Sequence, residues 1–402
     1  MSFTALAERL DVATPPTRDR ALDGLRALAV AGVVTGHWLV MALVVTETGS
    51  LRISSPLVAL PGFAGLSWAL QMLALFFLVG GYSSARSLAG SDDYGGWIRA
   101  RVRRLTRPVL AVTTALGLAF PLLFAAGVPA GTLRTTTALV VQPLWFIAVY
   151  AVLTALTPVA VAMVRRMGAW SVLPLLASVA LIDALRYGPW ADAMPGWLGL
   201  LTVLPGWGFG YVLGVAWSRG QLGRGGAAVL AVAGAALALL LVLRLGYPVS
   251  LVGVPGSGRV NSHPPSLLVL AVAMVQCGLA IRFHDRLGRA LQAPRRWAVV
   301  AVLNLVALTI FCWHQVSLVL LTALTPTNLP GLHQIPDGVG WAGWRLAWFP
   351  VHLTLLASLV FLARRFESPW QRTLGRFTPA VMAIAAVATV GYTTYAVLAL
   401  SH

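Results

Sequence analysis

The sequence predicts an all-α membrane protein, a polytopic transmembrane helical bundle of about 10–11 spans with a cytoplasmic N-terminus. Composition is the first observation: of 402 residues, 58% are hydrophobic and only 10% are charged, whereas soluble domains average about 25% charged residues. The second is that apolar runs long enough to cross about 30 Å of hydrocarbon recur along the whole chain. Together they exclude a soluble globular domain.

The predicted spans follow one another through short connections that are rich in Pro and Gly. The first covers residues 22–45 and has no convincing small-residue cleavage site, so we expect a retained span rather than a signal peptide. The others are predicted at residues 66–88, 108–127, 143–164, 170–187, 197–217, 226–245, 265–283, 298–323, 344–363 and 378–400. Residues 1–21 are then a cytoplasmic segment, 22–365 a membrane domain of about ten spans, and 366–402 a cytoplasmic loop plus an eleventh span.

The basic residues test this topology, because cytoplasmic loops carry an excess of Lys and Arg. All 29 basic residues are arginines, and the formal net charge is +17. With the N-terminus inside, 23 of the 29 lie on the cytoplasmic side, and only six lie outside: Arg52, Arg134, Arg186, Arg244, Arg259 and Arg345. This placement favours contact with the lipid bilayer, whose headgroups are anionic, or attraction of an anionic cytosolic substrate, and it argues against a nucleic-acid partner.

The first span contains two ionisable residues, Arg26 and His37. A separation of eleven residues is about 20° more than three helical turns, so both side chains share one face. The rise is roughly 16 Å, which places Arg26 near the cytoplasmic interface and His37 deep in the hydrocarbon. Ionisable residues inside a membrane are candidates for function. The alternatives are that Arg26 only fixes orientation and that His37 only bonds a neighbouring helix.

Further candidates are scattered along the chain. The two cysteines, Cys277 and Cys312, fall inside predicted spans, so we expect no disulfide framework. No His, Cys, Asp or Glu cluster has metal-ligand spacing, so no metal site is expected. A basic stretch before the third span could bind an anionic donor: Arg99, Arg101, Arg103, Arg104 and Arg107. Residues of second rank, each with a structural alternative as a membrane-interface anchor, a turn or a helix contact, are Trp145, Asn261, His263, His314 and Arg345.

Taken in order, these motifs resemble the membrane acyltransferase-3 family, the bacterial integral-membrane O-acyltransferases. The resemblance covers nearly the whole chain, and its most specific part is Arg26 followed after ten residues by His37. The matching segments are Asp23-Gly24-Leu25-Arg26, Phe76-Phe77 with Gly81-Tyr82, Arg103-Arg104-Leu105 with Arg107-Pro108, Trp145-Phe146, Asn261 with Pro264-Pro265-Ser266, Phe311-Cys312-Trp313-His314, and Trp344-Arg345 through Glu367.

The resemblance implies acyl transfer from acyl-CoA, with acetyl-CoA one such donor, to a hydroxyl of a carbohydrate, glycolipid or small-molecule acceptor at the plasma membrane, with no bound cofactor. Arg26 and the arginines at 99–107 would bind the donor, and His37 would be a general base or carry the acyl group. The five residues of second rank, Trp145, Asn261, His263, His314 and Arg345, would bind the acceptor. Relatives commonly have Phe-Phe-x-x-Ser-Gly where this chain has Gly80-Gly81, so no serine role is carried over. Some also have an extracytoplasmic domain, so transfer here is expected to be direct or through a separate extracytoplasmic partner.

Two other function classes fit the same residues. In a transporter or exporter, Arg26 and His37 would belong to a proton or substrate pathway, although we detect no internal repeat. A structural subunit of a surface-polysaccharide complex would itself have no acyl-transfer activity.

Overall fold

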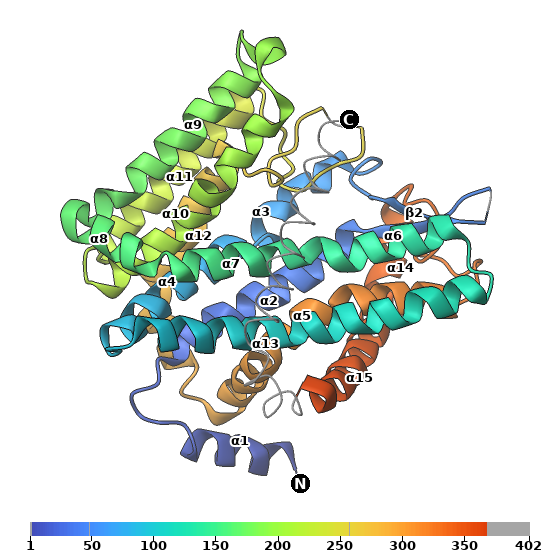
Figure 1. Cartoon of the computed structure of the whole chain (residues 1–402), viewed down its shortest axis with the longest axis horizontal. Coiled ribbons are helices and arrows are strands. Elements are labelled where there is room, and N and C mark those ends of the chain that lie inside the picture. Colours follow the sequence, from blue (N-terminus) through green and yellow to red (C-terminus); the bar gives the residue numbers. More distant parts are fainter. Residues whose placement is uncertain (1, 48, 257, 368–402) are drawn as a thin grey trace.

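The computed structural model describes residues 2–47, 49–256 and 258–367, and these are mainly helical (Figure 1). A short antiparallel hairpin, β1 (Ala42–Val45) and β2 (Leu51–Ser54), pairs Ala42 with Ser54. The helices are α1 (Phe3–Val12), α2 (Arg20–Val40), α3 (Ser67–Leu70), α4 (Leu73–Ala89), α5 (Tyr94–Ala125), α6 (Ala130–Val141), α7 (Trp145–Ala155), α8 (Thr157–Met167), α9 (Leu173–Tyr187), α10 (Val203–Ser218), α11 (Arg224–Arg244), α12 (Leu267–Ala290), α13 (Pro294–Leu324), α14 (Val339–Ala347) and α15 (Phe349–Glu367).

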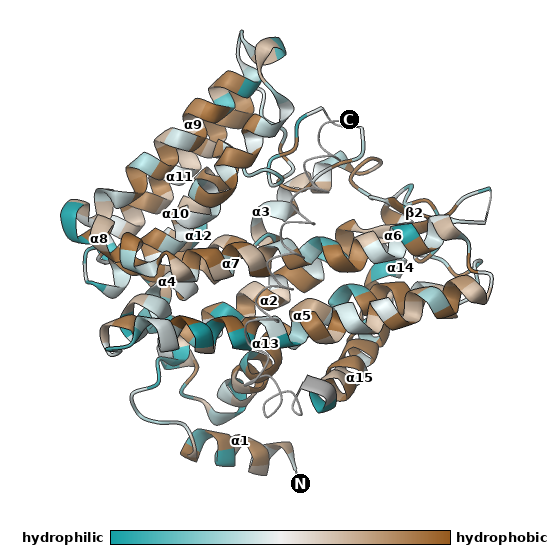
Figure 2. Cartoon of the chain, in the orientation of Figure 1, coloured by the Kyte–Doolittle hydropathy of each residue, from teal (hydrophilic) through white to brown (hydrophobic). Residues whose placement is uncertain are grey.

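The helices confirm the predicted bundle. Among the described residues, eight helical segments are long and apolar enough to cross a membrane, and α14 with α15, bent by 43°, can make a ninth. Helix α2 adds the predicted first span, although Asp23, Arg26 and His37 reduce its hydropathy. Each of the ten predicted spans up to residue 363 therefore has a helical counterpart. The predicted eleventh, 378–400, lies outside the described residues. Figure 2 shows apolar residues along the middle of these helices.

Two predicted boundaries are wrong. The fourth span is not 143–164: α6 and α7 form one helical run over residues 130–155, and the chain breaks at Leu156. Pro158, not Pro143, begins the new helix, because proline fits the first turn. The arginines at 99–107 lie on α5 and not in a loop. At 32 residues, α5 is about 48 Å long and extends beyond the hydrocarbon.

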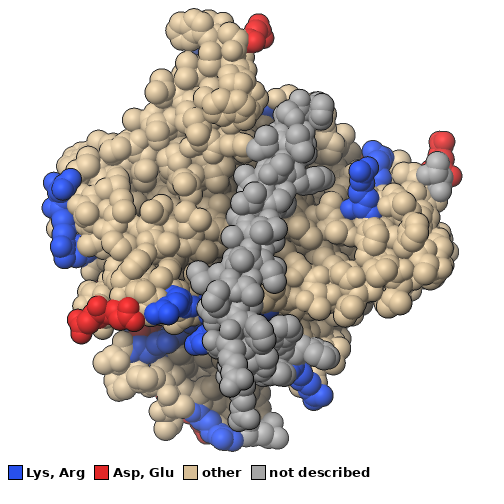
Figure 3. Space-filling model, in the orientation of Figure 1, with Lys and Arg blue, Asp and Glu red and all other residues tan. Residues whose placement is uncertain are grey.

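The helices alternate in direction as ten successive crossings require. Helices α4 and α10, the second and sixth, run parallel, since Ala74 contacts Gly210 and Leu78 contacts Gly214. Helices α11 and α12, the seventh and eighth, run antiparallel, since Gly234 lies against Ala271 and Gly278 against Ala227. The start of α2, the start of α5, and the connections α10–α11 and α12–α13 therefore share one side, here called the arginine face. In Figure 3, many of the visible arginines lie along the left and lower margins.

Helices α4 and α10 cross at unusually short distance because glycines occupy their contact. A Cβ atom at Gly81 would collide with the carbonyl oxygen of Tyr211, and one at Gly214 would collide with that of Leu78. Small residues permit this close approach between membrane helices. Gly80 also lacks space for a side chain, because the ring of Tyr150 on α7 occupies it. The paired glycines Gly80 and Gly81 thus serve the packing of α4 against α7 and α10.

We predict that Gly81→Ala destabilises the bundle, because the Tyr211 backbone cannot yield to a new methyl group without separating α4 from α10. Overpacking of this kind costs about 1–3 kcal/mol. Tryptophan fluorescence during thermal unfolding in detergent measures the effect. Gly117→Ala on α5 is the matched control, since a Cβ atom there meets nothing within 4 Å. Equal unfolding temperatures for the two variants would contradict this packing.

Candidate active site

Helices α2 and α13 pair in parallel, and their contacts join the polar residues of both helices. The Asn304 side-chain amide donates to the backbone oxygen of Asp23 at 2.7 Å, and an Arg26 nitrogen lies 3.4 Å from Asn304 Oδ1. About three helical turns further on, His37 contacts His314. The sequence separations of these contacts are 281, 278 and 277 residues. This near-constant separation shows that the two helices run in one direction at one register.

Two histidines meet where α2 ends against α13, because His37 lies in the last turn of α2. Nδ1 of His37 lies 2.7 Å from Nε2 of His314, and the rings are 4.9 Å apart. The Nδ1 of His314 lies 2.7 Å from the carbonyl oxygen of Phe311, and the Gln315 side chain reaches His37 at 3.1 Å. His314 is fully buried, whereas His37 is partly exposed. We expected His314 to bind the acceptor. In the structure, His314 is fully buried and contacts the partly exposed His37.

The end of α2 is fixed by a buried arginine. Arg345 is 0% exposed, and its guanidinium donates to the carbonyl oxygens of Trp38, Met41 and Gly331. A cation at a helix C-terminus also interacts favourably with the helix dipole. The expectation that Arg345 anchors the chain at an interface is therefore wrong, because its guanidinium is committed to backbone oxygens in the interior.

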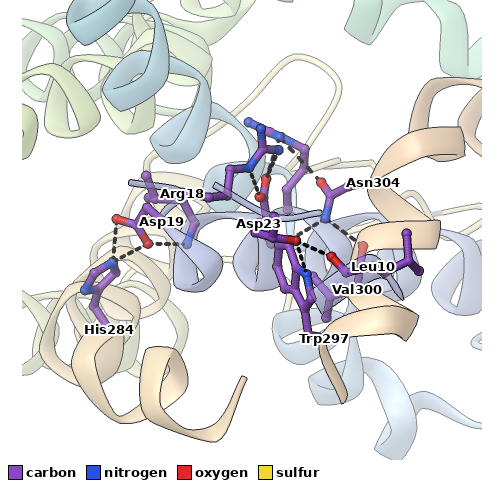
Figure 4. Close-up of polar contacts among 11 residues, drawn as sticks. Leu10, Arg18, Asp19, Asp23, His284, Trp297, Val300 and Asn304 are labelled. Carbon is purple, nitrogen blue, oxygen red and sulfur yellow. Dashed lines mark hydrogen bonds and ion pairs between the residues drawn. The ribbon is translucent and has the colours of Figure 1, made fainter. Parts of the chain in front are cut away.

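Arg26 is held at the other end of α2, on the arginine face. Its guanidinium lies 3.2 Å from Asp23 Oδ1, and the same carboxylate binds Arg18 at 2.5 Å (Figure 4). The Asp23 carboxylate is 4% exposed, while the Arg26 side chain is 25% exposed. Asp23 therefore orients a cation that still reaches solvent. Arg18 was missed by sequence reasoning because it precedes the predicted span.

The N-terminus of α2 is capped by Asp19. Its Oδ1 accepts from the backbone N–H of Leu22 at 3.1 Å, and both carboxylate oxygens lie 3.1 Å from His284 Nε2 on α12 (Figure 4). Burial opposes ionisation of Asp19, but the hydrogen bonds from His284 and Leu22 outweigh it and lower the pKa of this carboxyl. The cap thus joins α2 to α12 beside the Arg26 cluster.

The arginines at the start of α5 divide into two sets. Arg101 and Arg104 lie within electrostatic range of Tyr150 on α7, and so does Arg26. Arg101 is fixed by the Ser87 hydroxyl at 2.6 Å and by the Trp97 ring, 3.9 Å away. At the arginine face, Arg99 and Arg103 are exposed and Arg107 is partly exposed.

The candidates predicted near the outer side, His263, Trp145 and Asn261, differ in their exposure. His263 is exposed, lies edge-on to Trp145 with ring centroids 4.9 Å apart, and is within electrostatic range of His37. Asn261 is instead fully buried. Its amide donates to Pro248 and Ser250 carbonyls, and its oxygen accepts from the Ser266 hydroxyl. We call His37, His314, Trp145 and His263 the central site.

The chemistry available at the central site is that of imidazole and aromatic side chains beside a basic entrance. In the described part of the chain, no three His, Cys, Asp or Glu side chains are grouped so as to hold a metal ion. A partly exposed imidazole with a second imidazole behind it can accept and return a proton. The arginines can bind phosphate or carboxylate groups.

A family model described as an acyltransferase domain matches residues 19–364 of this 402-residue chain. The chain belongs to the acyltransferase-3 family. It is therefore a multi-pass membrane acyltransferase, and the matched residues include both ends of the α2–α13 pair. No curated protein and no solved structure matches the chain.

We predict that Arg345→Leu destabilises this acyltransferase and displaces the end of α2, because three carbonyl oxygens lose a charged donor. Hydrogen bonds to charged groups contribute about 1.5–3 kcal/mol each. The unfolding temperature in detergent should therefore fall by several degrees. The control is Arg244→Leu, which removes an exposed arginine at the end of α11. An unchanged unfolding temperature for Arg345→Leu would contradict the capping role.

Proposed function

We propose that this acyltransferase moves an acyl group from acyl-CoA, bound at the arginine face, to a hydroxyl of a carbohydrate, glycolipid or small-molecule acceptor. The observation that carries the proposal is the arrangement of α2. It holds a partly exposed arginine at one end and a partly exposed histidine about 16 Å deeper, and α13 orients both. An acyl-CoA donor likewise has anionic phosphates at one end and a reactive thioester at the other.

The proposed reaction needs little covalent chemistry from the protein, since a thioester is already activated. The acceptor oxygen attacks the thioester carbon while His37 removes the hydroxyl proton. A new C–O bond forms, the C–S bond breaks, and the CoA thiolate leaves. The proton on His37 then passes to that thiolate, so the base is regenerated. In this proposal transfer is direct, and His37 is a general base rather than an acyl carrier.

Arg26, Arg101 and Arg104 would bind the CoA phosphates through charge-assisted hydrogen bonds. Support comes from the fixed positions of Arg101, which binds the Ser87 hydroxyl, and of Arg26, which Asp23 holds in one orientation. The other arginines at this face would raise the local concentration of the anionic donor. Because acyl-CoA is a cytosolic metabolite, this proposal places the arginine face and the N-terminus in the cytoplasm, with the protein in the plasma membrane.

The acceptor would approach from the opposite side of the central site. His263 and Trp145 support this, because an exposed imidazole beside an indole ring offers a hydrogen-bonding group and an apolar surface to a sugar-like molecule. The acceptor would then meet the donor at His37. A separate extracytoplasmic partner could deliver or remove the acylated product.

We predict that purified wild-type protein releases CoA from acyl-CoA when membrane-lipid and sugar extracts are present. His37→Ala should reduce the rate by at least about 100-fold, since general-base catalysis contributes 10²–10⁴-fold. Arg26→Ala should mainly raise the donor concentration for half-maximal rate. Arg219→Ala, which removes an exposed arginine from the same face, is the control. A folded wild-type protein that neither binds nor consumes acyl-CoA would overturn the proposal and favour a transporter.

The donor site gives a second prediction. Arg104→Gln should raise the donor KM by about 10-fold or more, because one charge-assisted hydrogen bond to phosphate contributes about 1.5–3 kcal/mol. The kcat at saturating donor should change little. The same measurement on Arg219→Gln controls for the loss of one positive charge at the face. A similar KM change in both variants would show that the effect is nonspecific attraction and not a defined phosphate contact.

A further inference from the structure

We propose that His314 is a positioning residue that fixes the proton of His37 on Nδ1 and leaves its Nε2 as the proton acceptor. This inference rests on the proposed function of His37, and it adds the tautomer and the group that sets it. It is carried by hydrogen-bond geometries around the two rings: two of them each admit one placement of a proton, and the third is compatible with that placement.

The first geometry fixes the proton of His314. Its Nδ1 lies 2.7 Å from the carbonyl oxygen of Phe311. A carbonyl oxygen only accepts hydrogen bonds, so this nitrogen must carry the hydrogen. The backbone of His314 is also fixed, because its carbonyl oxygen accepts from the Trp38 indole at 3.1 Å and from the Ser317 hydroxyl at 2.7 Å. The ring of His314 therefore has both a fixed position and a fixed donor.

The second geometry transfers this constraint to His37. A neutral imidazole with a hydrogen on Nδ1 has a lone pair on Nε2. An imidazolium at this site would be a fully buried cation, and no carboxylate is among the contacts recorded for His314 in the described chain. Such an unpaired buried charge is costly. The 2.7 Å contact with His37 Nδ1 consequently requires the hydrogen to lie on His37, which leaves its Nε2 unprotonated.

The third geometry concerns Gln315. Its side-chain Nε2 lies 3.1 Å from His37 Nδ1, while its Oε1 is buried without a hydrogen-bond partner. The two ends of an amide exchange by a rotation of 180°, and their assignment follows the hydrogen-bond network. With hydrogen on His37 Nδ1, the rotated amide presents its oxygen to that N–H. Gln315 then becomes a second acceptor for the same proton, which is compatible with this tautomer, and its Nε2 gives up its contact with the Met41 sulfur at 3.0 Å.

The tautomer determines where the reaction proton moves. The acceptor hydroxyl gives its proton to His37 Nε2, and the ring becomes a cation. The hydrogen bond from Nδ1–H to His314 Nε2 then acquires a charged donor and becomes stronger. No additional proton is consumed, and His37 returns the proton from Nε2 to the leaving thiolate. His314 therefore acts through His37 and does not need to contact the substrate.

The first test measures the tautomer without reference to activity. Solid-state NMR of ¹⁵N-histidine-labelled protein in bilayers reports which ring nitrogen carries hydrogen, and His37→Gln identifies the His37 signals. We expect protonated Nδ1 and unprotonated Nε2 in the wild type. In His314→Leu, we expect a mixture of tautomers. A wild-type His37 protonated on Nε2 alone would overturn the inference, even in a protein without acyl-CoA turnover.

The second test measures catalysis in matched variants. His314→Leu should reduce kcat by about 10–100-fold, similar to the effect of losing the partner that orients a metal-bound histidine, with the KM for acyl-CoA unchanged. His314→Gln keeps an acceptor oxygen near the position of Nε2 and should recover a large part of kcat. If Leu and Gln reduce kcat equally in proteins with wild-type unfolding temperatures, the positioning role is wrong. If the wild type itself has no turnover, the proposed function fails, and the NMR result still decides the tautomer.

Discussion

The pairing of α2 with α13 is the constraint on which the structure depends. Polar groups inside a bilayer have no water to bind, so each must find a partner on a neighbouring helix. Asn304 binds the Asp23 backbone and Arg26, and His314 binds His37. Because these contacts occur at both ends of one parallel helix pair, the register of α2 against α13 is fixed. The positions of the arginine and the histidine are thereby linked.

The same pairing separates two tasks along one helix. Near the arginine face, Asp23 orients Arg26 while part of its side chain remains exposed. Deeper in the bundle, Arg345 caps the last turn of α2 and His314 supports His37 from behind. A charge-binding entrance and a proton-accepting centre can therefore keep a constant separation without a flexible loop between them. Glycines at their contact keep α4 close to α10, and the ring of Tyr150 packs against Gly80 on α4.

Within the described residues, local sequence information was sufficient for the number and order of the ten spans, for their alternating direction and for the common face of Arg26 and His37, because these depend on hydropathy and helical period. It was insufficient where the position of a side chain depends on contacts with residues far away in the sequence. Nothing near His314 indicates that it meets His37, which is 277 residues away. Arg345 has the sequence pattern of an interfacial anchor, and only the folded chain shows the carbonyl oxygens that surround it. The helix break at Leu156 was not predicted, because a proline such as Pro158 can either begin a new helix or lie within a bent one.

In the proposed mechanism, the donor enters at the arginine face and reacts at His37 from that side. Reconstitution into liposomes of one orientation, established with a tag at the N-terminus, tests this most directly. Membrane-impermeant acyl-CoA is added to one side at a time, and free CoA is measured with acceptor present on both sides. The account predicts release of CoA only when the donor faces the arginine side, and none in His37→Ala. Equal release from either side, or release only from the opposite side, would contradict it.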